Sequence, residues 1–102
     1  MHPAIHSNRK ALEELCRQAG VTRLELFGSG ARDDFDATRS DFDFLVEFDD
    51  DRSRPILDTY FALKQSLERL LARPVDLVSL PAVENPYVRA DIERSRTLVY
   101  AA

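Results

Sequence analysis

The sequence predicts an α/β (α+β) fold, with a small mixed β-sheet of three to four strands and about four helices. Short alternating or apolar segments, typical of strands, occur between longer segments whose apolar residues recur at helical spacing. The chain has 102 residues, of which 44% are hydrophobic, and no internal repeat or low-complexity linker interrupts it. We therefore expect one domain, residues 1–102, with a single core.

The N-terminal half contains a predicted helix and two predicted strands. Apolar residues recur at steps of three and four over residues 7–19, which predicts a helix that Gly20 can end. Residues 21–27 alternate and stop at a glycine, as a strand does. Residues 28–39 open with Gly-Ser-Gly and carry mixed charges, so we expect a tight turn, one helical turn and a loop. Residues 43–48 alternate again and form a second strand.

The C-terminal half contains two further helices and up to two strands. Residues 55–71 begin with proline and have apolar side chains at helical spacing, so this long helix should provide much of the core. Residues 75–80 are an almost unbroken apolar run around Asp76, as expected for a strand covered on both faces. An Asn-Pro start predicts a helix over residues 85–95. Residues 97–100 can add an edge strand or dock against the core.

Charge and composition exclude several classes of function. The chain has 14 basic and 18 acidic residues and a net charge of −4, so it lacks the basic surface that binds long nucleic acids. Cys16 is the only cysteine and lies on the apolar face of the first helix, which predicts a buried side chain rather than a nucleophile. No apolar run approaches the roughly 18 residues of a membrane span, and the N-terminus lacks signal-peptide features. We expect a cytoplasmic protein.

Two aspartates mark the most informative segment. Asp41 and Asp43 are separated by one residue, and in an extended chain such residues project from the same face. At about 5 Å and an effective dielectric constant near 20, two carboxylates repel by ~3 kcal/mol. A bound cation would relieve this repulsion, and oxygen ligands without histidine or thiolate favour Mg²⁺ or Mn²⁺.

A glycine and a serine precede this pair. Gly28 and Ser29 follow a predicted strand directly, where glycine permits close backbone approach and exposed N–H groups can bind phosphate oxygens. A plain turn uses the same residues, so the pair alone is a weak signal. Asp76 is also ambiguous, because a metal, a basic partner or exposure at a strand end can each account for an acid in an apolar run. When the Gly-Ser pair, the Asp-x-Asp segment and the later acid follow one another in this order, they indicate a site for metal and phosphate considerably more specifically than each does alone.

Taken together, these motifs resemble the minimal nucleotidyltransferase (MNT) family of the DNA polymerase beta-like superfamily, over nearly the whole chain. Gly28 and Ser29 match its phosphate-binding turn, and Arg32 matches a basic residue common after it. The segment from Ser40 to Asp43 matches its metal-binding segment, and Asp76 matches its third carboxylate. The spacer between Ser29 and Asp41 is one residue longer than usual. The resemblance implies a polymerase beta-like nucleotidyltransferase fold.

The resemblance also implies a function and a mechanism. Asp41 and Asp43 would bridge two Mg²⁺ or Mn²⁺ ions, and Asp76 would ligate the second ion or accept a proton. The end of the chain resembles MNT antitoxins, which implies transfer of AMP from ATP to a tyrosine of a cognate HEPN ribonuclease toxin, within a hetero-oligomer. An antitoxin that neutralises its toxin by binding alone is the main alternative. Transfer to a small molecule is less favoured, because such enzymes usually carry a further helical domain.

Several of these residues also have simpler explanations. Arg32 can bind phosphate or pair with the acids of residues 33–36. His2 and His6 have a spacing that could chelate a metal, but their terminal position predicts disorder. We expect Tyr87 to pack against the core rather than to contact a partner.

Overall fold

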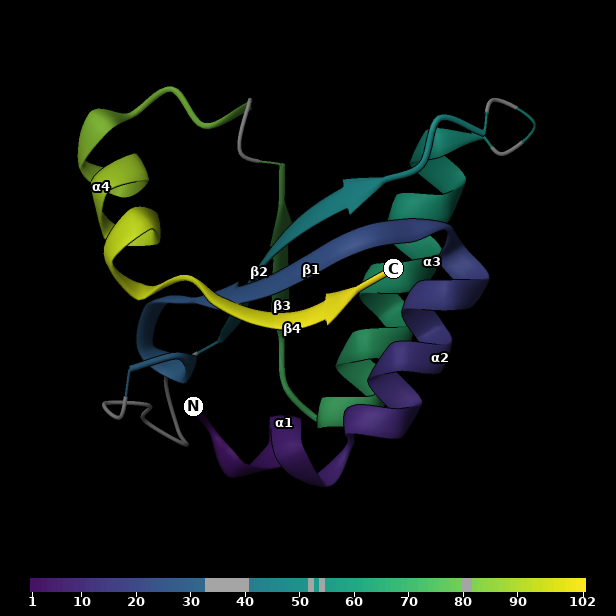
Figure 1. Ribbon diagram of the computed structural model, residues 1–102, viewed down its shortest axis with the longest axis horizontal. Coiled ribbons are helices and arrows are strands. Elements are labelled where there is room, and N and C mark those ends of the chain that lie inside the picture. The colour runs from purple at the N-terminus through teal and green to yellow at the C-terminus, as the bar shows by residue number, and fades with distance from the viewer. Residues whose placement is uncertain (33–40, 52, 54, 80–81) are drawn as a thin grey trace.

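The computed structural model describes residues 1–32, 41–51, 53, 55–79 and 82–102. In chain order the elements are α1 (Pro3–Ser7), α2 (Arg9–Ala19), β1 (Val21–Phe27), the 3-10 turn η1 (Gly28–Gly30), β2 (Phe42–Phe48), α3 (Ile56–Leu71), β3 (Val75–Val78), α4 (Pro86–Ser95) and β4 (Thr97–Ala101) (Figure 1). The sheet has the order β3-β2-β1-β4. Since β1 pairs antiparallel with β2 and β4 while β2 pairs parallel with β3, the mixed sheet predicted from the sequence is confirmed.

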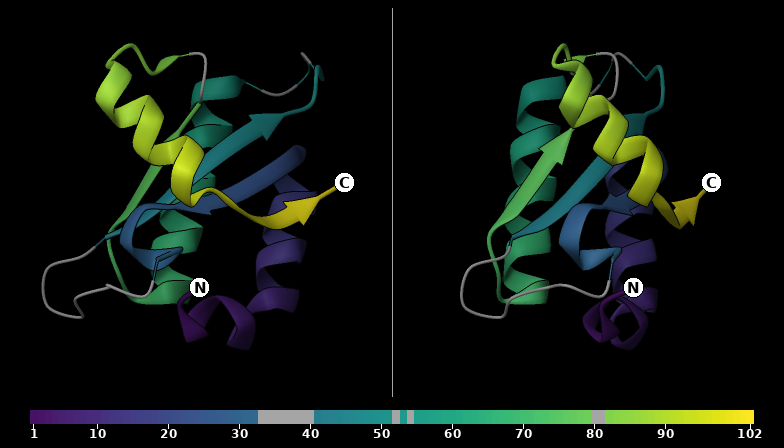
Figure 2. Two further views of the ribbon diagram at one scale, coloured as in Figure 1. Left: turned by 60° about the vertical axis from the view of Figure 1, so that its left-hand side comes forward. Right: turned by 90° about the vertical axis from the view of Figure 1, so that its left-hand side faces the viewer.

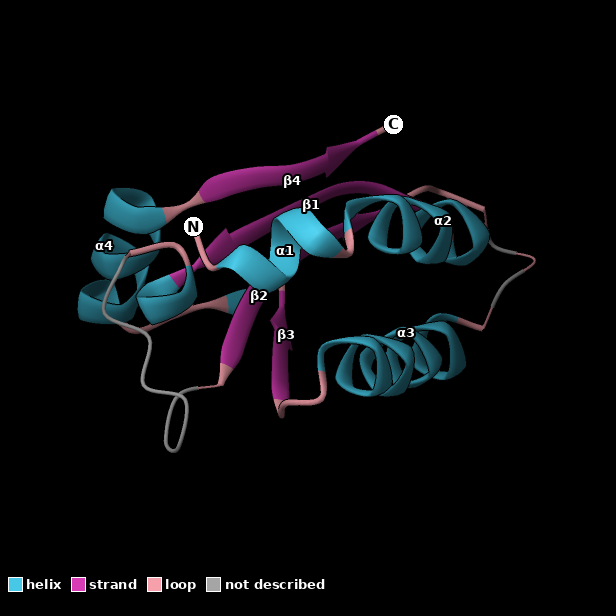
Figure 3. Cartoon of the chain, turned by 90° about the horizontal axis from the view of Figure 1, so that it is seen from below, coloured by secondary structure: helices cyan, strands magenta, loops and turns pink. Residues whose placement is uncertain are grey.

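The sheet is covered by helices on both faces. α2 and α3 pack side by side against one face, and α4 lies against the other (Figures 2 and 3). Alternation along the strands separates two hydrophobic clusters. The larger cluster includes Leu24, Phe44 and Leu67 on the side of α2 and α3, while the smaller contains Phe27, Leu45 and Ile92 on the side of α4. Within the described residues, no helix is long and apolar enough to cross a membrane.

The N-terminus differs from the prediction. Instead of one helix over residues 7–19 after a disordered start, two helices meet at Asn8, whose φ of −110° interrupts the helical backbone. The short first helix is held because Ile5 is fully buried in the core. His2 caps it by accepting a hydrogen bond from the Ala4 N–H, and its ring lies edge-on to Phe42 at 5.1 Å. The expected disorder of the terminal histidines is therefore wrong.

The other elements follow the predicted pattern closely. α3 buries Leu63, Leu67 and Leu71, one stripe at helical spacing. Cys16 is fully buried, and burial raises the pKa of its thiol to about 12, as expected for a side chain without a nucleophilic role.

Two expectations for the C-terminal half are corrected. β3 is an edge strand of the sheet, and Asp76 in it is exposed. Val75 and Leu77 join the larger hydrophobic cluster and Val78 packs against the smaller one, but Asp76 contributes to neither. The expectation that this strand is covered on both faces is therefore wrong at Asp76. Tyr87, expected to pack against the core, is 84% exposed because it lies on the outer side of the first turn of α4.

Candidate active site

The Gly-Ser turn is built around the conformation of Gly28. This residue has φ of +72°, and its carbonyl accepts hydrogen bonds from the N–H groups of Ala31 and Arg32 at 3.1 and 3.0 Å, which closes the predicted tight turn. A Cβ at this position would lie 2.6 Å from Oδ2 of Asp43. Glycine is therefore required twice, for its positive φ and for the close approach of the backbone to this carboxylate.

The parallel pairing of β2 and β3 brings two acids together. Asp43 pairs with Asp76 across β2 and β3, and with Phe27 across β2 and β1, so both carboxylates project from the sheet face that α4 covers. Asp41 precedes β2 by one residue and is exposed. Burial is the largest cause that raises the pKa of Asp43, followed by the negative charges of Asp76, Asp41 and Asp91 in that order, and together they bring this pKa to about 6. Among the described residues, negative charges outweigh positive ones around Asp43.

The chemistry of these donors fits a magnesium ion that also binds a nucleotide. Among the described residues, no three His, Cys, Asp or Glu side chains lie close enough to hold a metal ion by themselves. Mg²⁺ in nucleotide enzymes is usually held by one or two carboxylates together with substrate phosphates and water. Asp43 and its in-register neighbour Asp76 can supply such carboxylates, and a bound cation would offset the burial and the acidic neighbours that raise the pKa of Asp43.

Arg32 lies at the end of the same turn and forms an ion pair with α4. Its Nη1 donates to Oδ1 of Asp91 at 2.8 Å, and both side chains are roughly half exposed. The acids of residues 33–36, which the sequence offered as alternative partners, lie outside the described residues. The positive charge of Arg32 lowers the pKa of Asp43, so the guanidinium acts on the same site.

The remaining predicted residues are placed less completely. Ser29 is in the middle of η1 and is partly buried. Ser40 lies outside the described residues. Gly28, Arg32, Asp43 and Asp76 thus gather at one end of the sheet, where β1 ends and the parallel strands β2 and β3 begin.

Sequence reasoning missed the contribution of α4 to this site. The Gly28 N–H donates to Oγ of Ser95 at 2.9 Å, and that hydroxyl donates to the Asp91 carbonyl at 2.8 Å. Asp91 and Ser95 are four residues apart and therefore lie on neighbouring turns of one helix face. Their spacing was available from the sequence, but their partners lie 59 and 67 residues away along the chain.

A second missed cluster anchors the end of α4. Glu25 of β1 is 4% exposed and accepts hydrogen bonds from Nε and Nη2 of Arg96 at 2.9 and 2.7 Å, and from Nε of Arg23 at 2.7 Å. These bonds, with that to Arg96 first, lower the pKa of Glu25 to about 2. The cluster ties the start of β4 to the central strand.

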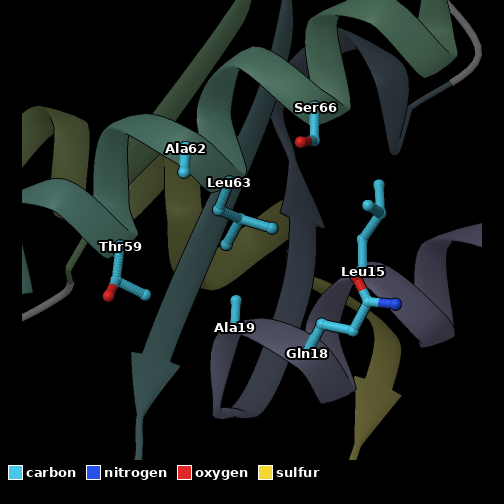
Figure 4. Close-up of a pocket in the computed structure, with 7 residues that line it drawn as sticks. All are labelled: Leu15, Gln18, Ala19, Thr59, Ala62, Leu63 and Ser66. Atoms are coloured by element: carbon cyan, nitrogen blue, oxygen red, sulfur yellow. The ribbon is translucent and has the colours of Figure 1, made fainter. Parts of the chain in front are cut away.

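A pocket between α2 and α3 is a different kind of site. It is lined by Leu15, Gln18, Ala19, Thr59, Ala62, Leu63 and Ser66 (Figure 4). These helices cover the sheet face opposite to the acids. Because none of the described residues that line it is charged, the pocket does not suit a triphosphate.

Comparison with known sequences identifies the family. The family model described as "Nucleotidyltransferase domain" matches residues 8–99. "Putative protein adenylyltransferase MJ1379" of Methanocaldococcus jannaschii is 39% identical over 96 residues, which cover 94% of this chain and 89% of the relative. "Putative protein adenylyltransferase MJ0128" of the same organism is 35% identical over 96 residues, with the same coverage of each chain.

Solved structures agree with the sequence comparison. A structure described as a "putative minimal nucleotidyltransferase" is 34% identical, with a TM-score of 0.73 over 95% of each chain. A chain from a toxin–antitoxin crystal structure with AMP-PNP has a TM-score of 0.68 at 22% identity over 93% of this chain and 74% of its own length, which shows the shared fold. A chain from a tri-AMPylated Shewanella oneidensis HEPN toxin in complex with MNT antitoxin has a TM-score of 0.64 at 20% identity, over 96% of this chain and 73% of its own length. Matched over most of its length, this chain belongs to the nucleotidyltransferase domain family and has the fold of its minimal members.

Proposed function

We propose that this chain transfers AMP from ATP to a tyrosine hydroxyl of a cognate HEPN ribonuclease toxin. The observation that carries the proposal is the pairing of Asp43 with Asp76 across parallel strands, beside the turn that begins at Gly28. In this arrangement the acids can hold divalent cations while the turn holds the phosphates of the same nucleotide.

The proposal gives each predicted residue a role. Gly28 and Ser29 bind the triphosphate through the turn, with Arg32 and Ser40 as further phosphate ligands. Asp41, Asp43 and Asp76 hold Mg²⁺ or Mn²⁺. When bound, these cations neutralise the phosphate charge and lower the pKa of the attacking hydroxyl, as in other two-metal sites.

The reaction makes one bond and breaks one. The phenolic oxygen of the acceptor attacks the α-phosphorus of ATP, and the bond from that phosphorus to the bridging oxygen of pyrophosphate breaks. Asp76, which is exposed and pairs with Asp43, would accept the phenolic proton if it does not ligate a metal ion. Because the reaction consumes ATP, the proposal places the protein in the cytoplasm.

A protein acceptor is supported by the surface of α4. Tyr87 and Val88 are 84% and 45% exposed on the helix that also carries Asp91 and Ser95. Exposed aromatic and aliphatic side chains of this kind are typical of protein interfaces. The structural neighbours include toxin–antitoxin complexes, which favours a HEPN toxin as the partner and a hetero-oligomer as the working state.

The direct test is to mix the purified protein with its cognate toxin, Mg²⁺ and ATP, and to weigh the toxin by intact mass spectrometry. We expect its mass to increase by one or more AMP groups, and peptide fragmentation should place them on tyrosine. Omission of Mg²⁺ or its removal by a chelator should prevent the increase. An unchanged toxin mass in the presence of folded enzyme and Mg²⁺-ATP would contradict the proposal.

Neutralisation by binding alone is the second candidate. It is favoured by the finding that no three potential metal ligands converge among the described residues. Replacement of Asp41 and Asp43 by asparagine separates the two functions in cells that express the toxin. Binding alone predicts that the double variant still protects these cells, whereas transfer predicts that protection is lost while the complex still forms.

A further inference from the structure

We propose that Ser95 is a positioning residue of the nucleotide site, which acts by holding the N–H of Gly28. This inference rests on the proposed function, because that function gives the Gly-Ser turn its role in phosphate binding. In this inference, α4 controls the orientation of the Gly-Ser turn relative to the acids, although it lies outside the sequence motif that marks the site.

The hydroxyl of Ser95 has no freedom to choose other partners. The residue is 8% exposed, and its Oγ donates its only proton to the Asp91 carbonyl at 2.8 Å. The lone pairs of Oγ accept the Gly28 N–H at 2.9 Å. The hydroxyl therefore points in one direction, and an alanine would leave the Gly28 N–H without this acceptor.

Gly28 is the residue through which such a contact can set the whole turn. Its N–H bonds to Ser95, its carbonyl accepts from Ala31 and Arg32, and its φ is +72°. The Gly28 carbonyl lies in the same peptide plane as the Ser29 N–H, so the bonds that fix Gly28 also fix the orientation of the Ser29 N–H. Because its Cα lies against Oδ2 of Asp43, a rotation of Gly28 would change the distance between the turn and the acids.

Ser95 is in turn held by rigid neighbours. Arg96 follows it directly and forms two hydrogen bonds with the buried Glu25 on β1. Three residues earlier, Ile92 is fully buried against the sheet, and its carbonyl accepts the Arg96 N–H at 2.8 Å. The end of α4 that carries this hydroxyl is therefore fixed to β1, as a positioning group requires.

A merely structural hydrogen bond would contribute to stability without acting on nucleotide binding. The two roles are separated by Ser95→Ala, with Ser95→Thr as the variant that restores the hydroxyl. Ser66→Ala is the matched control, because Ser66 is a half-buried helical serine on the opposite side of the sheet. If the added methyl group prevents folding of the threonine variant, the comparison of the two alanine variants alone decides the outcome.

The first measurement is independent of activity. Amide hydrogen exchange of Gly28, followed by NMR, should accelerate about tenfold or more in Ser95→Ala, and stay near the wild-type rate in Ser95→Thr and Ser66→Ala. Affinity for AMP-PNP with Mg²⁺, measured by calorimetry, should fall about tenfold in Ser95→Ala alone. Unchanged exchange of Gly28, or unchanged affinity despite faster exchange, would overturn the inference.

The second measurement uses the transfer reaction. In Ser95→Ala the KM for ATP should rise about tenfold while the KM for the toxin stays unchanged, because only the phosphate turn is misplaced. Equal changes in both constants would indicate general destabilisation and overturn the inference. If the wild-type protein transfers no AMP, the proposed function fails, whereas hydrogen exchange and AMP-PNP binding still decide the role of Ser95.

Discussion

Two buried or partly buried carboxylates on one sheet face have opposite electrostatic environments. Glu25 of β1 is surrounded by Arg96 and Arg23, which lower its pKa to about 2. Asp43 of the adjacent strand is partly buried and lies near other acids, and burial followed by these charges raises its pKa to about 6. Both project toward the side of α4, because Leu45 lies opposite Glu25 and Phe27 opposite Asp43 in the same antiparallel ladder.

The two charge environments indicate a structural role for Glu25 and a functional role for Asp43. The charge of Glu25 is balanced inside the protein, so the Glu25 cluster can stabilise the fold without any ligand. The charge of Asp43 is opposed by burial and by neighbouring acids, which is unfavourable for folding and becomes useful when a bound cation supplies positive charge.

The largest effect should be on catalysis. Asp43→Asn removes the carboxylate that lies between the turn and Asp76, so we expect the rate of AMP transfer to fall roughly 100-fold or more. Initial rates from intact mass spectrometry of the toxin would measure it. Asp58→Asn, an exposed acid in the first turn of α3, is the control and should leave the rate unchanged. If the Asp43→Asn variant transferred AMP at the wild-type rate, the pair formed by Asp43 and Asp76 would have no catalytic role.

The next effect concerns stability at the other carboxylate. Glu25→Gln removes the buried charge shared by Arg96 and Arg23 and leaves Arg96 with the more exposed Glu93, so it should lower the free energy of unfolding by roughly 2–3 kcal/mol at pH 7. Since the folded-state pKa of Glu25 is depressed, its contribution is present above pH 4.5 and is lost as the pH falls toward 2. Urea denaturation at several pH values would measure both.

A matched control for Glu25 lies on the surface. Glu14 pairs with Arg17 on the solvent-facing side of α2, where the two side chains are 54% and 60% exposed. Glu14→Gln should change stability by less than about 0.5 kcal/mol. Equal effects of the two substitutions would mean that the Glu25 cluster contributes no more than a surface ion pair.

Local patterns predicted most of the fold because its elements are amphipathic. The burial of Leu63, Leu67 and Leu71 follows directly from their spacing, as does the alternation of β2. The first helix was missed because its five residues are too few to show a period, and only Ile5 is buried. Contacts with the core decided its structure, because Met1 and Ala4 pack against the same cluster as the buried Ile5.

The site was predictable only in part for a similar reason. The motif located Gly28, Asp43 and Asp76, but the register that pairs the two acids depends on how β3 docks against β2. The contacts of Ser95 and Arg96 join positions 67 and 71 residues apart and have no local signature. The parts that surround the acids are therefore the parts that the sequence did not reveal.

A smaller effect of opposite sign is expected for Asp43 without metal. Its folded-state pKa of about 6 exceeds the ordinary value of 3.8, so the carboxylate increasingly destabilises the folded state as the pH rises from 3.8 to about 6, and the full effect is present above that pH. Asp43→Asn should therefore raise stability by roughly 1–2 kcal/mol at pH 8 in a chelator, and the gain should disappear near pH 4. Thermal melts at the two pH values would show it. If the Asp43→Asn variant were less stable than the wild-type protein at pH 8, a positive charge near Asp43 would have to stabilise its carboxylate, which contradicts this prediction.

The smallest effect tests whether an added cation makes the two carboxylates alike. AMP-PNP with Mg²⁺ at ten times its dissociation constant should stabilise the wild-type protein by about 1.4 kcal/mol, because it binds only the folded state. Replacement of Asp41 and Asp43 by asparagine should abolish the rise in melting temperature. Glu25→Gln should melt at a lower temperature and still show the full rise, because its cluster already holds balanced charges. A full response in the double asparagine variant would locate the nucleotide and its metal away from these acids.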